Sequence, residues 1–267
     1  AGSSLTMDSA EFSGNSGLYT GMGYGAGAYT AGAAEITGGL FQSNVLSFTA
    51  DIGPRAGGSG YGAGLYAESS LAISGTEILT NSNNAGPWYL SGGGGVFAQS
   101  GVKLTNARVI GNHTQYGDGG GIYAGTPTEV TGSLFQANSA NGPLYYANAG
   151  GMIVRGPDDG GGTATITGTR FLSNTSTSAG GALLLFGSSV DLNNSQFIAN
   201  DTSDRGGAIF LSRYTPLRAA NLLFARNTAG SGPGLFNFSA NNENLTLDYA
   251  TFAAPTPYGG SAIVKEG

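Results

Sequence analysis

Two short phrases recur along almost the whole chain, and this repeat restricts the possible folds more than any other feature. The phrases are Phe-x-x-Asn and Gly-Gly-Ala-Ile, and "FIANDTSDRGGAIF" (197–210) contains both in their constant order. Consecutive copies of the second phrase lie as little as 26 residues apart, and spacings of up to 37 residues contain inserts. A period of this size is typical of stacked structural units rather than of independent domains.

The first phrase occurs nine times, and all but the last copy end in asparagine; Pro255 stands at the end of the ninth. Asparagine tolerates left-handed backbone and is favoured in turns. We therefore expect a structural ladder of turn asparagines whose side-chain amides bond along the stack. Its predicted members are Asn15, Asn44, Asn81, Asn112, Asn138, Asn174, Asn200 and Asn227. The ladder also accounts for the Asn-x-Ser/Thr triplets without glycosylation.

Each unit contains two or three short runs in which apolar and polar residues alternate, bounded by Gly and Asn. Such runs are typical of β-strands, and no segment has the 3.6-residue apolar stripe of a helix. The sequence therefore predicts an all-β, right-handed parallel β-helix (a β-solenoid) of about nine coils, with inserted loops on one corner. Residues 1–267 are expected to form this single domain, roughly 43 Å long at the usual strand spacing.

Aligned copies of the second phrase give three columns of like residues, which we expect to fill the interior of the coil. The alignment places Met152 and Ser261 in a column of small residues, and Ile153 and Ala262 in an aliphatic column. The third, aromatic-rich column is predicted to contain Tyr29, Tyr66, Phe97, Tyr123, Val154, Leu184, Phe210, Phe236 and Ile263.

Composition excludes several classes of function. With 10 Lys+Arg against 16 Asp+Glu and no basic cluster, the chain is not expected to bind nucleic acid or anionic membranes. It contains no cysteine and only one histidine, so disulfides, thiolate sites and histidine clusters are excluded, and no metal or cofactor is predicted. No apolar run approaches the ~20 residues that span a bilayer. The opening "AGSSLTMDS" is interpreted as the mature end of a secreted protein.

The pairing of "FLSN" with "GGALL" (171–184) and of "FIAN" with "GGAIF" (197–210) resembles the repeat of the chlamydial polymorphic outer-membrane proteins and of related β-helical passenger domains. This resemblance covers nearly the whole chain. It implies an extracellular or cell-surface adhesin, present as a passenger fragment or as a secreted relative. The chain departs from that family in having no cysteine.

The inserts between the two phrases are longest in the first five coils and are rich in aromatic residues. Exposed aromatic side chains offer a large contact area at a low entropic cost, so they are candidates for a surface that binds protein, glycan or a sister subunit. An equally open alternative is that they fold down as small local cores. The candidate contact residues are Phe48, Trp88, Tyr89, Tyr116, Tyr145 and Tyr146.

Many parallel β-helices are polysaccharide lyases or hydrolases, which need clustered carboxylates. The candidates here are Asp51, Asp118, Asp158, Asp159, Asp201 and Asp204. Asp118 and the Asp201/Asp204 pair are expected on one corner but three coils apart, and His113 is expected in an exposed loop. We therefore predict no catalytic site, and the enzymatic alternative is the least favoured.

The first repeat starts at Leu5 and the last phrase continues to Val264, which leaves little chain for a cap at either end. Unpaired strand edges template further strands. We therefore predict a structural protein that assembles head to tail with itself, adhesive or not, through Leu5, Met7, Ile263 and Val264. The alternative is an adhesin fragment whose neighbouring coils cover these edges.

Overall fold

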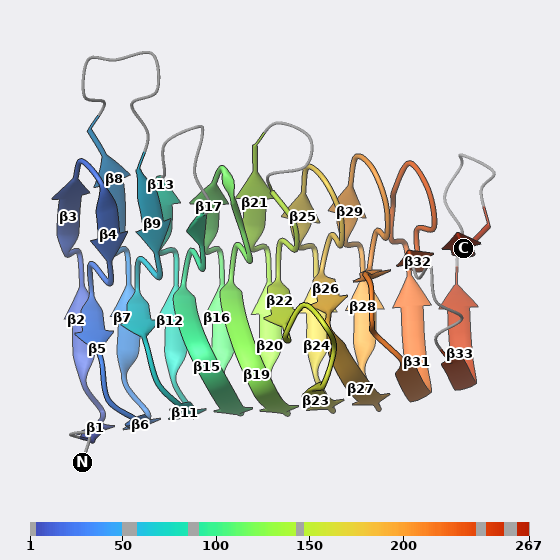
Figure 1. Ribbon diagram of the computed structural model, residues 1–267, viewed down its shortest axis with the longest axis horizontal. Coiled ribbons are helices and arrows are strands. Elements are labelled where there is room, and N and C mark those ends of the chain that lie inside the picture. Colours follow the sequence, from blue (N-terminus) through green and yellow to red (C-terminus); the bar gives the residue numbers. More distant parts are fainter. Residues whose placement is uncertain are drawn as a thin grey trace.

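The computed structural model describes residues 4–49, 58–84, 91–142, 147–238, 244–253 and 261–266, and all of its regular elements are strands. The strands of successive coils pair in parallel, and the chain advances along one axis as a right-handed parallel β-helix (Figure 1). The predicted fold is confirmed, but the helix has about eight turns instead of nine, because nine stacked strands are separated by eight steps. At the usual strand spacing this gives a rod roughly 38 Å long.

The first coil shows the order of the strand positions: β1 (Leu5–Asp8), β2 (Glu11–Ser13), β3 (Ser16–Tyr19), β4 (Met22–Tyr24) and β5 (Ala28–Thr30). Later coils repeat this order, although some strands run through two positions. The stack on β1 contains β6 (Ala34–Thr37), β11 (Leu71–Ser74), β15 (Val96–Thr105), β19 (Ile122–Thr131), β23 (Gly162–Thr167), β27 (Ser188–Asn193), β31 (Leu217–Ala225) and β33 (Leu245–Ala253).

The stack on β2 contains β7 (Leu40–Gln42), β12 (Glu77–Leu79), β16 (Arg108–Ile110), β20 (Leu134–Gln136), β24 (Arg170–Leu172) and β28 (Gln196–Ile198), followed by the second halves of β31 and β33. The stack on β5 contains β10 (Leu65–Ala67), the first halves of β15 and β19, then β22 (Met152–Arg155), β26 (Leu183–Phe186), β30 (Ile209–Leu211), β32 (Leu235–Phe238) and β34 (Ile263–Glu266).

Two smaller sheets form the upper part of the molecule in Figure 1. The seven-stranded sheet contains β3, β8 (Val45–Phe48), β13 (Ser82–Asn84), β17 (His113–Gln115), β21 (Ser139–Asn141), β25 (Thr175–Ser176) and β29 (Asp201–Thr202). The four-stranded sheet contains β4, β9 (Ser59–Tyr61), β14 (Ser91–Gly92) and β18 (Gly117–Asp118). The predicted corner inserts after β8 and β13 lie mostly outside the described residues.

A stack of phenylalanine rings from the β2 column forms the centre of the main core. Phe135, Phe171 and Phe197 are fully buried, and neighbouring rings lie parallel with their centroids 4.9 Å apart. Rings one coil apart meet face to face because a parallel register places the same position of each coil directly above its copy. Ile78 and Val109 fill the same column in two coils, also without exposure.

In two coils, the observed register differs by one residue from the predicted columns. Met152 pairs with Ile122 and Leu183, so Met152 belongs to the aliphatic column and Gly151 takes the small position. Ala149 has the left-handed backbone conformation (φ 55°) that glycine has at this position in neighbouring coils. The Gly-Gly pair that follows it was therefore aligned one residue too early. In the last coil Ile263 pairs with Leu235, so Ile263 is the aliphatic residue and Val264 follows the aromatic column.

Candidate functional site

The asparagine ladder is confirmed, and it is a structural feature of the core. Asn138 is fully buried; its Nδ2 donates to Val109 O at 2.8 Å and to Asn174 Oδ1 at 2.9 Å. Its Oδ1 accepts hydrogen bonds from the backbone N and the Nδ2 of Asn112, both at 3.0 Å. The amide is thus fully satisfied without water. The same contacts link the other members from Asn15 to Asn227.

The predicted left-handed conformation belongs to the residue before each ladder asparagine, not to the asparagine itself. Thr80 (φ 52°), Ala137 (φ 52°) and Ser173 (φ 53°) are examples. The left-handed residue turns the chain, and the asparagine that follows points its side chain inward. There its amide pairs with backbone groups that the turn leaves without strand partners.

Of the predicted contact surface, Phe48 and Tyr116 lie among the described residues, whereas Trp88, Tyr89, Tyr145 and Tyr146 lie outside them, as does Asp51. The Phe48 ring packs at 5.9 Å against Tyr19, beside a small cluster with Leu46. Phe48 thus follows the alternative reading, in which loop aromatics form local cores. Tyr116 lines a separate cavity of 390 Å³.

His113 was expected in an exposed loop, but it lies in β17 and is half buried. Its Nδ1 is 2.9 Å from Ser139 Oγ in the next coil. Burial lowers the pKa of the His113 imidazole below its usual value, and a hydrogen bond with Ser139 opposes this shift. Successive side chains of a strand point to opposite faces of the sheet, so a residue in a strand can be partly buried. The assignment of this residue to a loop did not take that into account.

The aromatic-rich column was predicted to fill the interior, and this is wrong for its aromatic members in the first coils, although Val154 does lie in the main core. Tyr29, Tyr66, Phe97 and Tyr123 stack on one another outside the main core, with ring centroids 5.5, 5.5 and 4.3 Å apart. Successive side chains of a strand point to opposite faces. Because the aliphatic neighbours of these rings point inward, the rings point outward. This alternation was visible in the sequence and could have identified the outer column.

The outer aromatic column faces a groove at the junction of the β5 stack and the four-stranded sheet. From that sheet, Tyr24 and Tyr61 reach across: the Tyr24 ring lies 5.5 Å from Tyr61 and 4.7 Å from Tyr66. A cavity of 610 Å³ extends along this junction, and Arg155 and Pro157 line its far side. A second cavity of 410 Å³ continues along the later coils and shares Arg155 with the first.

The second cavity gathers charged side chains that are distant in sequence. Asp118, Arg155, Asp204 and Arg205 all line it. Asp118 Oδ1 accepts hydrogen bonds from the backbone N (3.0 Å) and Nδ2 (2.9 Å) of Asn148. Burial raises the pKa of the Asp118 carboxyl above its usual range, and these hydrogen bonds and Arg155 oppose the shift in part.

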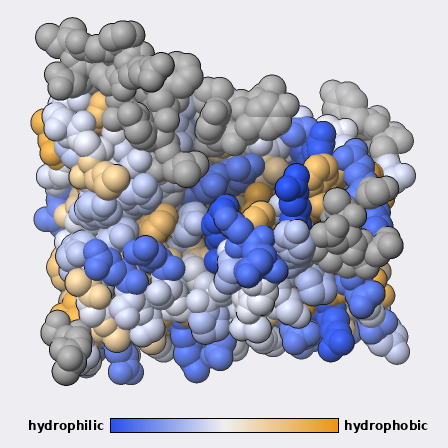
Figure 2. Space-filling model, viewed as in Figure 1, coloured by the Kyte–Doolittle hydropathy of each residue, from blue (hydrophilic) through white to orange (hydrophobic). Residues whose placement is uncertain are grey.

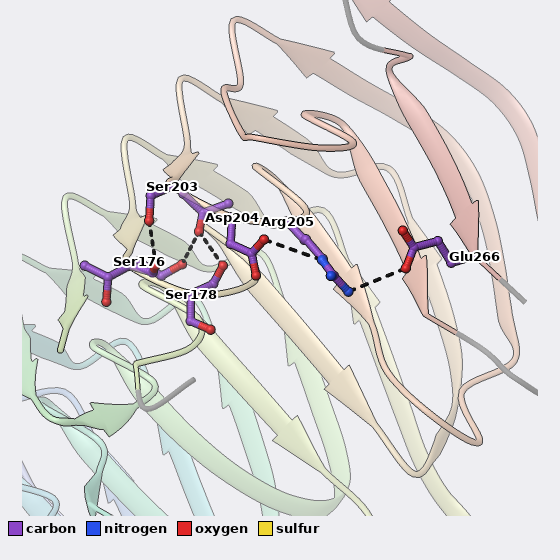
Figure 3. A network of polar contacts seen from close by, with 8 residues as sticks. Ser176, Ser178, Ser203, Asp204, Arg205 and Glu266 are labelled. Atoms are coloured by element: carbon purple, nitrogen blue, oxygen red, sulfur yellow. Dashed lines mark hydrogen bonds and ion pairs between the residues drawn. The ribbon is translucent and has the colours of Figure 1, made fainter. Parts of the chain in front are cut away.

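Both arginines of this cavity are held by carboxylates and aromatic rings. Arg155 Nη2 is 2.9 Å from Asp158 Oδ1, and its guanidinium lies 4.5 Å from the centre of the Phe186 ring. Figure 3 shows Arg205 between Asp204 and Glu266, with N–O distances of 3.4 and 3.5 Å. Cation–π contacts and partial ion pairs of this kind orient a guanidinium without burying its charge.

The other predicted carboxylates lie apart from this cluster. Asp201 accepts a hydrogen bond from Thr228, and Asp159 is exposed in the turn after β22. In the described part of the chain, no three His, Asp or Glu side chains are placed to hold a metal ion. Among the same residues, no helix has the length and hydropathy needed to cross a membrane.

The predicted assembly residues form the two ends of the rod. Leu5 and Met7 in β1 and Ile263 in β34 are half buried and pack against the main core from its ends, and Val264 is half buried beside Ile263. Among the described residues, β1 pairs only with β6, and β33 pairs only with β31. Within the described part of the chain, β1 and β33 therefore each have one edge without a strand partner.

Comparisons with protein-family models, with curated proteins and with solved structures found no match to this chain.

Proposed function

We propose that this protein is a non-enzymatic structural subunit of the extracellular space or the cell surface that assembles end to end into a filament or layer. The single observation that carries the proposal is the state of the two ends. Leu5, Met7 and Phe12 at one end, and Leu247 and Phe252 at the other, belong to core columns but are only partly buried. Covering such apolar surface is the main driving force of association.

The two ends also match each other in sequence. The first strand reads Leu-Thr-Met-Asp (5–8), and the last full coil begins Leu-Thr-Leu-Asp (245–248). If β1 of one copy continues the register of β33 in another, leucine lies on leucine, Met7 lies on Leu247 and Phe12 lies on Phe252. A head-to-tail contact of this kind does not close on itself, so it generates a filament.

A further apolar surface lies on the first coil. Among the described residues, the large hydrophobic side chains that are clearly exposed are Leu18, Met22, Tyr24, Tyr29, Tyr214 and Tyr249. Four of these six belong to β3, β4 and β5, and Leu18 is 71% exposed. Exposed apolar residues gathered on one end are typical of an interaction surface. Cell-surface placement is supported by the resemblance to surface passenger domains.

The proposal is tested by sedimentation velocity and electron microscopy over a range of protein concentrations. We expect the unaltered protein to form rods longer than one molecule, and the double variant Leu5→Lys/Met7→Lys to remain monomeric. Thr6→Lys is the matched control, because Thr6 lies on the same strand but points to solvent. It should assemble like the unaltered protein. A monomeric unaltered protein at every concentration and salt would contradict the proposal.

A further inference from the structure

The groove beside the outer aromatic column runs along most of the rod. Its first cavity begins at Met22 in the first coil, and its second ends at Phe238 in β32. Eight strands of the β5 stack lie along it, and their seven steps span roughly 34 Å. The two cavities, of 610 and 410 Å³, meet at Arg155 and each have the size of a ligand pocket. The groove is therefore shaped for an extended ligand.

The first half of the groove presents ring edges and hydroxyl groups. The rings of Phe97 and Tyr123, which are half buried, stack face to face above the buried Tyr66, so their faces are occupied and their edges are what remains for a ligand. Aromatic edges carry partial positive charge and attract oxygen atoms. The hydroxyls of Tyr61 and Tyr123 line the same cavity and have no hydrogen-bond partner among the described residues. This surface is suited to a ligand that is rich in oxygen.

The second half presents acceptors and amides beside apolar rings. One oxygen of Asp118 is bonded to Asn148, which leaves the other oxygen available as an acceptor. Phe186 and Phe210 line the wall. Figure 2 shows hydrophobic and strongly hydrophilic side chains next to each other across this face. Carboxylates and amides form hydrogen bonds with the hydroxyls of a sugar, and aromatic rings contact its apolar surface. Both kinds of group lie next to each other here.

The charge of the groove decides between classes of extended ligand. Asp118 and Asp204 line it, and Asp158 and Glu266 pair with its two arginines, so four carboxylates stand against the guanidinium groups of Arg155 and Arg205. The whole chain has a formal charge of −6. A negative groove on a negative protein repels polyanions such as nucleic acids and uronic acid polymers. We infer that this groove binds an uncharged, linear polysaccharide.

The inference is tested by calorimetric titration of the full chain with neutral hexasaccharides of β-1,4-linked glucose, xylose and mannose. Polygalacturonate, heparin and oligolysine serve as charged comparisons. We expect at least one neutral hexasaccharide to bind, and the three charged polymers to bind more weakly or not at all. Tyr123→Phe should weaken binding about fivefold, because it removes a hydroxyl group from the groove, and Asp118→Asn about tenfold, because it replaces a charged acceptor oxygen by an amide donor.

Two controls separate the groove from the rest of the protein. Tyr249→Phe removes the hydroxyl of a tyrosine that is 86% exposed and far along the chain, and should leave binding unchanged. The end variant Leu5→Lys/Met7→Lys should bind the same hexasaccharide as the unaltered protein, whether or not assembly is lost. No binding of any neutral hexasaccharide, tighter binding of a charged polymer, or equal losses in Tyr249→Phe and Tyr123→Phe would each overturn the inference.

Discussion

Single asparagines connect each coil to the next, and their contribution to stability is large because they are buried. Replacing Asn138 by Ala removes one acceptor and two donors: the buried backbone N–H of Asn112 loses its acceptor, and the side chain of Asn112 and the carbonyl of Val109 each lose one hydrogen bond. Each unsatisfied buried group costs roughly 1–3 kcal/mol. We expect Asn138→Ala to lower the free energy of unfolding by at least about 3 kcal/mol.

Chemical denaturation monitored by circular dichroism measures this loss. Asn141→Ala is the matched control, because Asn141 is an exposed asparagine three residues further along the same coil. It should change stability by less than about 0.5 kcal/mol. Equal effects of the two substitutions would show that the ladder contributes nothing beyond the intrinsic preferences of asparagine.

His113 makes stability depend on pH in a defined direction. Its pKa is lowered in the folded protein, mainly by burial, so the unfolded chain binds the proton more readily. The stabilisation from His113 is therefore fully present above the unfolded pKa of about 6.5 and is lost as the pH falls toward the lower folded value. We expect the denaturation midpoint to decrease as the pH is lowered from about 7.5 to about 5, the window in which the unfolded chain takes up the proton first.

The contribution of this histidine is isolated by comparison with His113→Asn, which keeps a hydrogen-bonding group beside Ser139. Asp118 titrates in both proteins, and its raised pKa acts in the opposite direction at lower pH, so it cancels in the difference. The variant should show a flatter dependence of stability on pH over the same window. Parallel curves for the two proteins would rule out His113 as the origin.

Strands of the β2 stack are held together chiefly by their central rings. Phe171 is fully buried between Phe135 and Phe197, and its neighbour Leu172 points outward and is half buried. Replacing Phe171 by Ala leaves a cavity that two flanking coils cannot fill, and should cost about 3–5 kcal/mol. Leu172→Ala on the same strand should cost much less. Denaturation midpoints of the two variants test which substitution costs more. Similar losses in both variants would indicate a loosely packed interior and contradict the prediction.

Assembly of the rods should depend on the salt concentration, because like charges meet in the proposed end contact. In the proposed contact the exposed Asp8 of one copy lies beside the exposed Asp248 of the next. Salt screens repulsion between such like charges. We therefore expect longer rods at roughly 0.5 M salt than at 0.02 M, a range over which the screening length shrinks about fivefold.

Reversing one of these charges gives a sharper test. Asp248→Lys should promote assembly at low salt, since the introduced ammonium group would face Asp8 of the next copy. Asp191→Lys is the control, because Asp191 is exposed in the middle of the rod and its replacement makes the same change in net charge. Sedimentation at low salt distinguishes the two. Similar behaviour of both variants would point to a general effect of net charge and against the proposed end contact.

The repeat in the amino-acid sequence was sufficient to predict the parallel β-helix, the buried phenylalanines and the asparagine ladder. These features depend on a local pattern that recurs at the same position of each coil, and stacking in register places equal residues on each other. The predicted registers at Met152 and Ile263 were each wrong by one residue. At Met152 the reason is that alanine can replace glycine in a left-handed turn, as Ala149 does.

The groove depended on how the strands are arranged in space. The tyrosines of its two walls, Tyr24 and Tyr66, come from different sheets, and Asp118 and Asp204 are contributed by coils far apart in the sequence. Their meeting is set by the angle at which the four-stranded sheet adjoins the β5 stack. No local pattern encodes that angle, because it results from the packing of all the coils together.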